Sequence, residues 1–254
     1  MKKILIANWK MNPAAAVEAV ALAKKIERAA RRRAQIEVVV APPAPFLIPV
    51  ARVLKMARLG AQDAFWEDAG AYTGEVSPSQ LESVGVLYVI VGHSERRMLL
   101  GETDDMIAKK LRASARRGMT AILCVGERER AGGEVAPEVG DQLRNALAGI
   151  TKPAFKNIVV CYEPVWAIST SAGARPAEAD DVFRASVYIR RIAGNMVGRE
   201  AARGLRIIYG GSVDAGNIAE FLDKGRVDGA LVGEASLDPE EFGRIIDETA
   251  SAAG

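Results

Sequence analysis

The chain has 254 residues, of which 49% are hydrophobic and 26% are charged, a composition typical of a globular protein with a sizeable core rather than of a disordered chain. The 34 Lys and Arg residues nearly balance the 32 Asp and Glu residues and leave a formal charge of +2. This balance gives no support for binding to nucleic acid or to an anionic membrane, so any anionic partner must be met by a local group of residues.

The N-terminus carries only a short apolar run before the polar Asn8, and no later segment approaches the roughly 20 apolar residues of a membrane span. The two cysteines, Cys124 and Cys161, lie inside apolar runs, where buried reduced thiols are usual. We therefore expect a soluble, unexported, cytoplasmic protein.

Eight short apolar runs follow one another along the chain. Their apolarity is continuous rather than alternating, which predicts strands covered on both faces, as in a parallel sheet flanked by helices. The third run is the weakest prediction because it is short and carries Gly60. The runs are residues 4–8, 36–41, 58–63, 87–92, 121–126, 157–163, 205–211 and 228–233.

Segments of helical pattern separate these runs. The first begins near Pro13 and closes with the basic stretch 28–35, which we interpret as a solvated helix C-terminus rather than an anion-binding patch. Residues 105–118 end on a glycine suited to a C-cap. Eight strand-then-helix units in about 250 residues predict an α/β fold of the (β/α)₈ barrel type, in one domain spanning residues 1–254.

In such barrels the catalytic groups lie at the C-terminal ends of the strands. Asn8 and Lys10 follow the first run, His93 follows the fourth and Glu163 follows the sixth. Glycine-rich turns follow the last two runs, and their N–H groups suit a phosphate, although each turn alone is a weak signal. A base, a hydrogen-bond donor, a lysine and an anion site are thus expected at one rim.

His93 is the only histidine of the chain. The motif HSERR predicts a helix start with Ser94 as N-cap and Glu95 in the first turn. The positive end of that helix should lower the pKa of His93, so that a neutral imidazole donates to a carbonyl oxygen. The alternative is a structural histidine with satisfied hydrogen bonds.

Glu163 ends an apolar run, and its hydrophobic surroundings should raise its pKa toward the range of an effective base. The alternative is a salt bridge with a neighbouring cation. Residues 164–176 then combine an apolar start, small residues and a closing proline, a composition typical of a hinged lid.

These residues occur in motifs that together resemble the triosephosphate isomerase family over nearly the whole chain. The motifs are ANWKMN, AYTGEVSP, YVIVGHSERR, AILCVGE, YEPVWAI, IIYGGSV and GALVG, in the family's order and spacing. The resemblance implies a homodimer that interconverts dihydroxyacetone phosphate and glyceraldehyde 3-phosphate through an enediolate, without a cofactor or a metal.

The resemblance also implies a role for each rim residue. Glu163 would be the base that moves a proton between two substrate carbons, and His93 the neutral group that polarises the carbonyl. Lys10 would stabilise the negative charge of the enediolate and the phosphate, and Asn8 would orient the substrate. Glu95 would hold the polar network of the site.

Backbone N–H groups at Ser169, Ser212, Gly233 and Glu234 would bind the phosphate, if the resemblance holds. The loop containing Thr73 would be the family's interdigitating dimer loop, whose tip reaches the partner's active site.

The chain departs from the family pattern at this phosphate end. Residues 168–171 read Ile-Ser-Thr-Ser where the family usually has Ile-Gly-Thr-Gly, and Gly233 is followed by Glu234 where two glycines are common. A serine costs about 1 kcal/mol or more where the glycine has a positive φ. We expect the Glu234 carboxylate to point outward at a helix start, and we expect a working enzyme with weakened phosphate binding.

Two competing functions fit parts of the pattern. The barrel could act on another small sugar phosphate, because a phosphate site alone serves many substrates. It could also have lost turnover and bind a phosphate ligand, which only the lid substitutions support. The complete set of Asn8, Lys10, His93 and Glu163 argues against the first, and the retention of Glu163 and His93 argues against the second.

Overall fold

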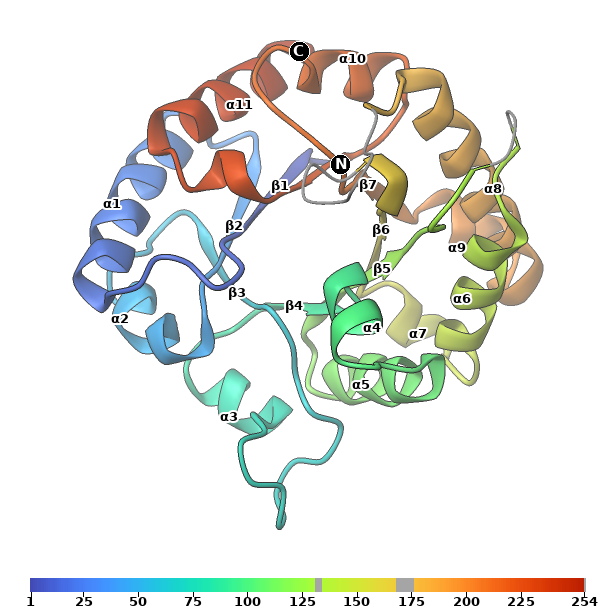
Figure 1. Ribbon diagram of the computed structural model, residues 1–254, viewed down its shortest axis with the longest axis horizontal. Helices are drawn as coiled ribbons and strands as arrows, with labels where there is room; N and C mark the ends of the chain where they lie inside the picture. The colour runs from blue at the N-terminus through green and yellow to red at the C-terminus, as the bar shows by residue number, and fades with distance from the viewer. Residues whose placement is uncertain (131–133, 168–175, 254) are drawn as a thin grey trace.

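The structure is a computed structural model that describes residues 1–130, 134–167 and 176–253. Its eight strands are parallel and form a closed barrel in chain order, each pairing with its neighbours and the last pairing with the first (Figure 1). The predicted (β/α)₈ fold and all eight predicted strands are confirmed, with end points shifted by two residues or fewer. The strands are β1 (Ile4–Asn8), β2 (Glu37–Ala41), β3 (Arg58–Ala61), β4 (Tyr88–Val91), β5 (Thr120–Val125), β6 (Ile158–Tyr162), β7 (Arg206–Tyr209) and β8 (Gly229–Val232).

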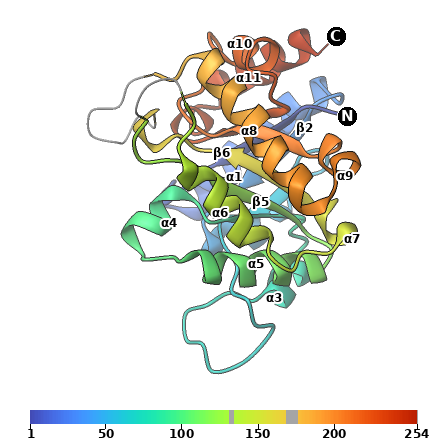
Figure 2. The same ribbon diagram turned by 90° about the vertical axis from the view of Figure 1, so that its right-hand side faces the viewer.

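Helices surround the barrel on the outside (Figures 1 and 2). In the described residues no helix is both long enough and apolar enough to cross a bilayer. The helices are α1 (Ala16–Arg32), α2 (Leu47–Ala51), α3 (Pro78–Ser83), α4 (Ser94–Leu99), α5 (Asp104–Arg116), α6 (Pro137–Leu147), α7 (Lys152–Phe155), α8 (Ala179–Val197), α9 (Arg199–Arg203), α10 (Ile218–Asp223) and α11 (Pro239–Ala252), with short 3₁₀ turns η1 (Ala44–Phe46), η2 (Val165–Ala167) and η3 (Glu234–Ser236).

Local sequence explains where the longer helices start and stop. α5 begins after Thr103, whose hydroxyl accepts from the N–H of Met106 at 3.4 Å. It ends before Gly118, which has a φ of +69° that favours glycine. The helix predicted over residues 105–118 is therefore confirmed. The basic end of α1 lies at its C-terminus, as expected.

Alternate residues of each strand face two different cores. Ile4 and Ile6 of β1 belong to a cluster inside the barrel, whereas Leu5 and Ala7 belong to the larger cluster between the strands and the helices. Because both faces are buried, the strands carry no polar alternation until they reach the rim. Both cysteines are buried and free, as predicted.

Glu27 is a buried carboxylate on the outer face of the barrel, and sequence reasoning did not single it out. It lies on α1 and is 4% exposed. Its oxygens accept from the N–H of Met56 at 3.0 Å and from that of Ala57 at 3.0 Å, just before β3, and from Arg31 at 2.7 Å. Burial raises the pKa of Glu27, but the hydrogen bonds from Arg31 and the backbone lower it further, to below its ordinary value.

We expect Glu27→Ala to lower the free energy of unfolding by about 2 kcal/mol at neutral pH, because two backbone donors lose their acceptor. The folded-state pKa lies below the ordinary value of 4.5. The stabilisation is therefore complete above that pH and is lost as the pH falls through the folded-state pKa. Denaturant titration at fixed protein concentration, at neutral and acidic pH, measures this.

The matched control for that experiment is Glu129→Ala, which removes an exposed carboxylate. A difference between wild type and Glu27→Ala that stays constant into strong acid would contradict the assigned role of the carboxylate.

Candidate active site

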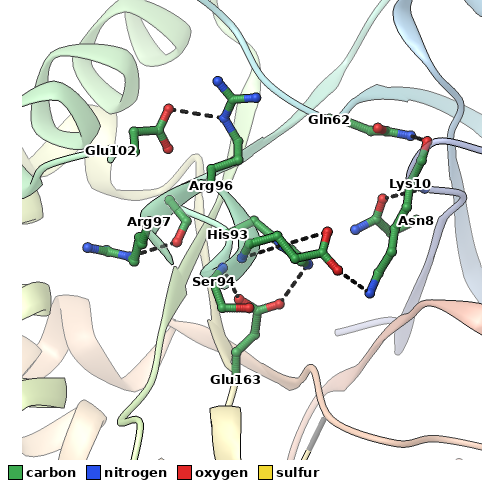
Figure 3. A network of polar contacts seen from close by, with 11 residues as sticks. Asn8, Lys10, Gln62, His93, Ser94, Arg96, Arg97, Glu102 and Glu163 are labelled. Atoms are coloured by element: carbon green, nitrogen blue, oxygen red, sulfur yellow. Dashed lines mark hydrogen bonds and ion pairs between the residues drawn. The ribbon is translucent and has the colours of Figure 1, made fainter. Parts of the chain in front are cut away.

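A pocket of about 730 Å³ opens at the C-terminal ends of the strands. Side chains from the ends of β1, β4 and β6 point toward one another there (Figure 3). Ser169 lies outside the described residues, as do the other three residues of the altered lid sequence 168–171. The pocket wall includes Asn8, Lys10, His93, Glu163, Ser212, Gly233 and Glu234.

The chain turns sharply after β1, and this turn places Lys10. Asn8 is 5% exposed, and its Oδ1 accepts from the backbone N–H of Lys10 at 3.1 Å. Lys10 itself has a φ of +51°, a left-handed conformation that costs energy for any residue other than glycine. The side chain of Gln62 holds the turn by donating to the carbonyl oxygens of Lys10 at 2.8 Å and Ala41 at 2.9 Å. Sequence reasoning missed Gln62.

Lys10 forms an ion pair across the pocket with the first turn of α4. Its Nζ lies 2.5 Å from Oε1 of Glu95. Glu95 is in that first turn, as predicted. The contact joins β1 to β4 at the rim and holds the lysine charge beside His93.

The predicted N-cap of α4 is wrong. His93, not Ser94, is the N-cap, because the imidazole Nδ1 accepts from the N–H of Glu95 at 3.3 Å. Ser94 is instead the first residue of the helix, and its N–H donates to Oε2 of Glu163 at 3.0 Å. A nitrogen that accepts a hydrogen bond carries no proton, so the remaining imidazole proton belongs on Nε2.

Glu163 lies against His93 at the centre of the site. Its Oε1 is 3.0 Å from Nε2 of His93, and the two residues are 2% and 7% exposed. Close packing holds the carboxylate from the other side, since a Cβ on Gly210 would lie 2.8 Å from Cγ of Glu163. The glycine of the turn after β7 is therefore needed for this approach.

Glycine and serine shape the turns that follow β7 and β8 at the pocket wall. Ser212 donates through its hydroxyl to the carbonyl oxygen of Ala167 at 3.1 Å, which ties the turn after β7 to the segment after β6. A Cβ on Gly233 would lie 3.4 Å from Cε of Lys10. Glu234 is exposed and begins η3, so the expected helix start is confirmed.

A buried carboxylate anchors the beginning of the predicted lid. Glu127 is fully buried, and its Oε1 accepts from the hydroxyl of Tyr162 at 2.7 Å and from Nε1 of Trp166 at 3.0 Å. These contacts fix η2 directly after Glu163. Glu127 follows β5 and was visible in the motif AILCVGE, but nothing in its local sequence indicated its partners.

A second group of charged residues, also missed from the sequence, holds α4 in place. Arg96 lies 2.8 Å from Asp63 and 3.1 Å from Glu102. Lys110, only 2% exposed, contacts the same two carboxylates. These four residues connect the end of β3, α4 and α5, so they fix the helix start that carries His93.

Comparison with known proteins decides the family. The family model described as triosephosphate isomerase matches residues 3–249. The triosephosphate isomerase of Dictyoglomus thermophilum is 42% identical over 249 residues, 96% of this chain and 98% of that protein. Those of Caldanaerobacter subterraneus and Carboxydothermus hydrogenoformans are each 43% identical, over 96% and 97% of this chain and 98% of either protein. The chain belongs to the triosephosphate isomerase family.

For this member of the triosephosphate isomerase family, the predicted pKa shifts of His93 and Glu163 are both wrong in the structure described. Burial lowers the pKa of His93, but the adjacent Glu163 carboxylate outweighs it and raises the pKa above its ordinary value. Burial raises the pKa of Glu163, but His93 and the Ser94 N–H outweigh it and lower the pKa. The N–H of Glu95 on Nδ1 opposes protonation of the imidazole, so the shift depends on Glu163 remaining in contact.

We expect the pKa of His93 to lie above 6.5 in the ligand-free protein and to fall in Glu163→Gln, because the neighbouring negative charge is removed. The imidazole signals of a chain with one histidine need no assignment, so titration followed by NMR measures this directly.

Glu234→Gln is the control for this titration, since its carboxylate is exposed at the pocket wall and is not among the groups that shift His93. An unchanged pKa in Glu163→Gln would show that the contact does not govern the protonation of His93.

Proposed function

We propose that this protein is a triosephosphate isomerase that interconverts dihydroxyacetone phosphate and D-glyceraldehyde 3-phosphate, a step of glycolysis and gluconeogenesis. One observation carries the proposal. A buried carboxylate and a buried imidazole, 3.0 Å apart, share a pocket with a lysine, in a chain whose relatives bear that name. The reaction moves a proton between adjacent carbons through an enediolate, so we infer that it needs neither a cofactor nor a metal.

Glu163 is the base in this proposal. In the structure its oxygens are engaged by His93 and the N–H of Ser94, which stabilise the anion and weaken it as a base. Proton transfer therefore requires the carboxylate to turn from these partners toward a substrate carbon. Burial then remains as the cause that raises its pKa, which makes it an effective base.

His93 polarises the substrate carbonyl. The N–H of Glu95 occupies Nδ1, so the Nε2–H is the group that donates toward the pocket. When Glu163 turns away, the larger of the two negative charges that raise the pKa of His93 leaves with it, and Lys10 opposes the effect of the remaining Glu95. Burial and the helix N-terminus then keep the imidazole neutral, and a neutral imidazole can both donate and recover a proton.

Lys10 and Asn8 supply the remaining charge and orientation. The Lys10 ammonium balances the negative charge of the enediolate and the phosphate, while Glu95 positions it. Asn8 fixes the turn that presents the lysine. The fixed position of the Lys10 ammonium matters, because a group stabilises developing charge best when it need not reorganise during the reaction.

We assign the phosphate to the backbone N–H groups of Ser212, Gly233 and Glu234, together with Ser169. The first three lie on the pocket wall, and a Cβ on Gly233 would lie 3.8 Å from Nζ of Lys10. Glu234 is exposed, which supports the outward orientation of its carboxylate. Weakened phosphate binding from Glu234 and the lid serines stays a prediction.

The alternative functions are not favoured. A binding barrel without turnover has no need of a carboxylate and an imidazole in mutual contact at the pocket floor. A barrel that acts on another sugar phosphate gains no support from the relatives. They match nearly the whole chain, and they are named triosephosphate isomerases.

We further propose a homodimer through the loop around Thr73. This loop joins β3 to α3 and extends away from the barrel in both views (Figures 1 and 2). Residues 71–75 are exposed. The ring of Phe65 braces the loop. It stacks on the ring of Trp66, with centroids 4.0 Å apart, and its centroid lies 4.5 Å from that of the Tyr72 ring. A braced but exposed loop suits insertion into a partner.

We also propose that residues 1–254 act as one domain and that the protein works in the cytoplasm. The barrel closes from β1 to β8 and leaves no strand for a second sheet within the described residues. The free, buried cysteines suit a reducing compartment.

We expect Glu163→Gln to lower kcat by roughly 10²- to 10⁴-fold, because the amide cannot accept the proton. The measurement is steady-state conversion of glyceraldehyde 3-phosphate to dihydroxyacetone phosphate in the presence of a chelator. Glu248→Gln, which neutralises an exposed carboxylate on α11, is the control. Negligible turnover by folded wild-type protein would reject the proposed reaction, and turnover that survives in Glu163→Gln would reject the assigned base.

We expect the purified chain to sediment as a dimer, and Thr73→Arg to shift it toward monomer, because a cation in a packed interface loses its hydration. Analytical ultracentrifugation over a concentration series measures this. Val17→Arg, at a residue of α1 that is 75% exposed, should remain dimeric. A monomeric wild type would contradict the assignment of the loop.

A further inference from the structure

The only two cysteines of the chain lie side by side beneath Glu163. Cys124 of β5 and Cys161 of β6 are register partners on neighbouring strands, and both face the inside of the barrel. Their sulfur atoms and a carboxylate oxygen of Glu163 all lie within 4.8 Å of one another. Three groups that can bind a metal thus converge at one buried point, a feature that the isomerase reaction does not use.

We propose that Cys124, Cys161 and Glu163 form a binding site for a thiophilic divalent cation of the zinc type, and that occupation of this site blocks the enzyme. Two sulfurs and one carboxylate oxygen are ligands that Zn²⁺ accepts, at about 2.3 Å and about 2.1 Å, with a fourth position left for water. Tetrahedral ligands at these lengths lie roughly 3.3–3.8 Å apart, so the group needs only a modest contraction.

A bridging ion fits the two strands better than a disulfide. The side chains of register partners on parallel strands point the same way, so their Cβ atoms lie close to the strand spacing of about 4.8 Å apart, whereas the Cβ atoms of a disulfide lie about 3.8 Å apart. Both cysteines are free in the structure. An ion with two metal–sulfur bonds spans the gap without drawing β5 and β6 together.

The surrounding packing already holds the ligands in place. A Cβ on Gly210 would lie 2.6 Å from Sγ of Cys161 and 2.8 Å from Cγ of Glu163. The glycine therefore gives both side chains room to approach each other. Both cysteines are fully buried, so little ordering of the ligands is required on binding.

A second pocket supplies the route to the site. It encloses about 450 Å³, and its wall includes Cys124 and Glu163 together with Ser94 and Gln142. Glu163 is the residue that separates it from the substrate pocket, since it lines both. A cation can therefore approach Cys124 and Glu163 from this side, and Cys161, which lines neither pocket, is reached past them.

Binding has a defined chemical balance. The ion gains two thiolate bonds and one carboxylate bond, and the two S–H protons leave to solvent or buffer. The carboxylate that holds the ion can no longer turn toward a substrate carbon. Inhibition therefore rests on the proposed role of Glu163, whereas binding of the ion does not.

Cadmium is the probe, because cadmium–thiolate bonds absorb in the ultraviolet and the chain has no other cysteine. We expect Cd²⁺ titration of the full-length protein to give an absorbance that saturates at one ion per chain. Cys161→Ala should weaken Cd²⁺ binding by at least about tenfold. Loss of a residue that only supports a metal ligand already costs about that much, and this variant removes a ligand itself. Cys124→Ser is the second variant, and Val159→Ala, inside the barrel on the same strand, is the control that keeps the site.

Turnover is followed in the same titration. Wild-type activity should fall as the absorbance rises and return when a chelator is added, while Cys161→Ala should remain active at the same Cd²⁺ concentration. No thiolate absorbance in wild type, or equal inhibition of Cys161→Ala, would overturn the site. Absorbance without inhibition would overturn the coordination by Glu163. A wild type that lacks turnover altogether would reject the proposed function, and the absorbance would still test the site.

Discussion

Closure of eight parallel strands into one barrel is the constraint on which the rest of the molecule depends. Every strand must bury one face inside the barrel and the other under the helices, which explains the continuous apolar runs. The same closure brings the C-terminal ends of all eight strands to one rim. Polar residues that are far apart in sequence, such as Lys10 and Glu95, therefore meet in ion pairs there.

At that rim, burial and pairing act in opposite directions on the same two groups. Burial alone would raise the pKa of Glu163, as the sequence suggested, and would lower that of His93, for which the sequence had suggested the helix N-terminus as the cause. The contact between them reverses both shifts in the structure described. The chemistry proposed for the site therefore depends on the carboxylate exchanging its protein partners for a substrate. Once it has done so, burial becomes the dominant influence on the pKa values of both groups.

Much of the fold was predictable from the sequence, because its signals are local. Runs of apolar residues and caps such as Thr103 depend only on neighbours along the chain. The rim positions of Asn8, Lys10, His93 and Glu163 followed from the fold together with the order of the runs. The N-cap of α4 could not be predicted in this way, since serine is the better cap by local preference, whereas Glu163 accepts the Ser94 N–H from another strand.

Long-range partners account for the other residues that the sequence did not reveal. Gln62 is recognisable only once its carbonyl partners on β1 and β2 are known, because glutamine has no preference for such a place. Arg96 and its group of three other charged residues look like ordinary surface charges when only the sequence is considered. Cys124 and Cys161 were expected to be buried, but their pairing depends on the register of β5 and β6, which the sequence pattern does not fix.

The two ends of the barrel hold buried or half-buried carboxylates with different kinds of partner. At the N-terminal end, Glu37 accepts from the hydroxyl of Tyr88 and pairs with Arg206. Burial and that carboxylate raise the pKa of Tyr88 to about 12, so the tyrosine keeps its proton and the contact persists at any ordinary pH. Glu163 at the opposite end has a backbone N–H and an imidazole as partners, and histidine exchanges its proton far more readily than tyrosine or arginine does. A carboxylate whose partner can change its charge is able to exchange that partner, which the proton transfer proposed for Glu163 requires and the contacts of Glu37 do not provide.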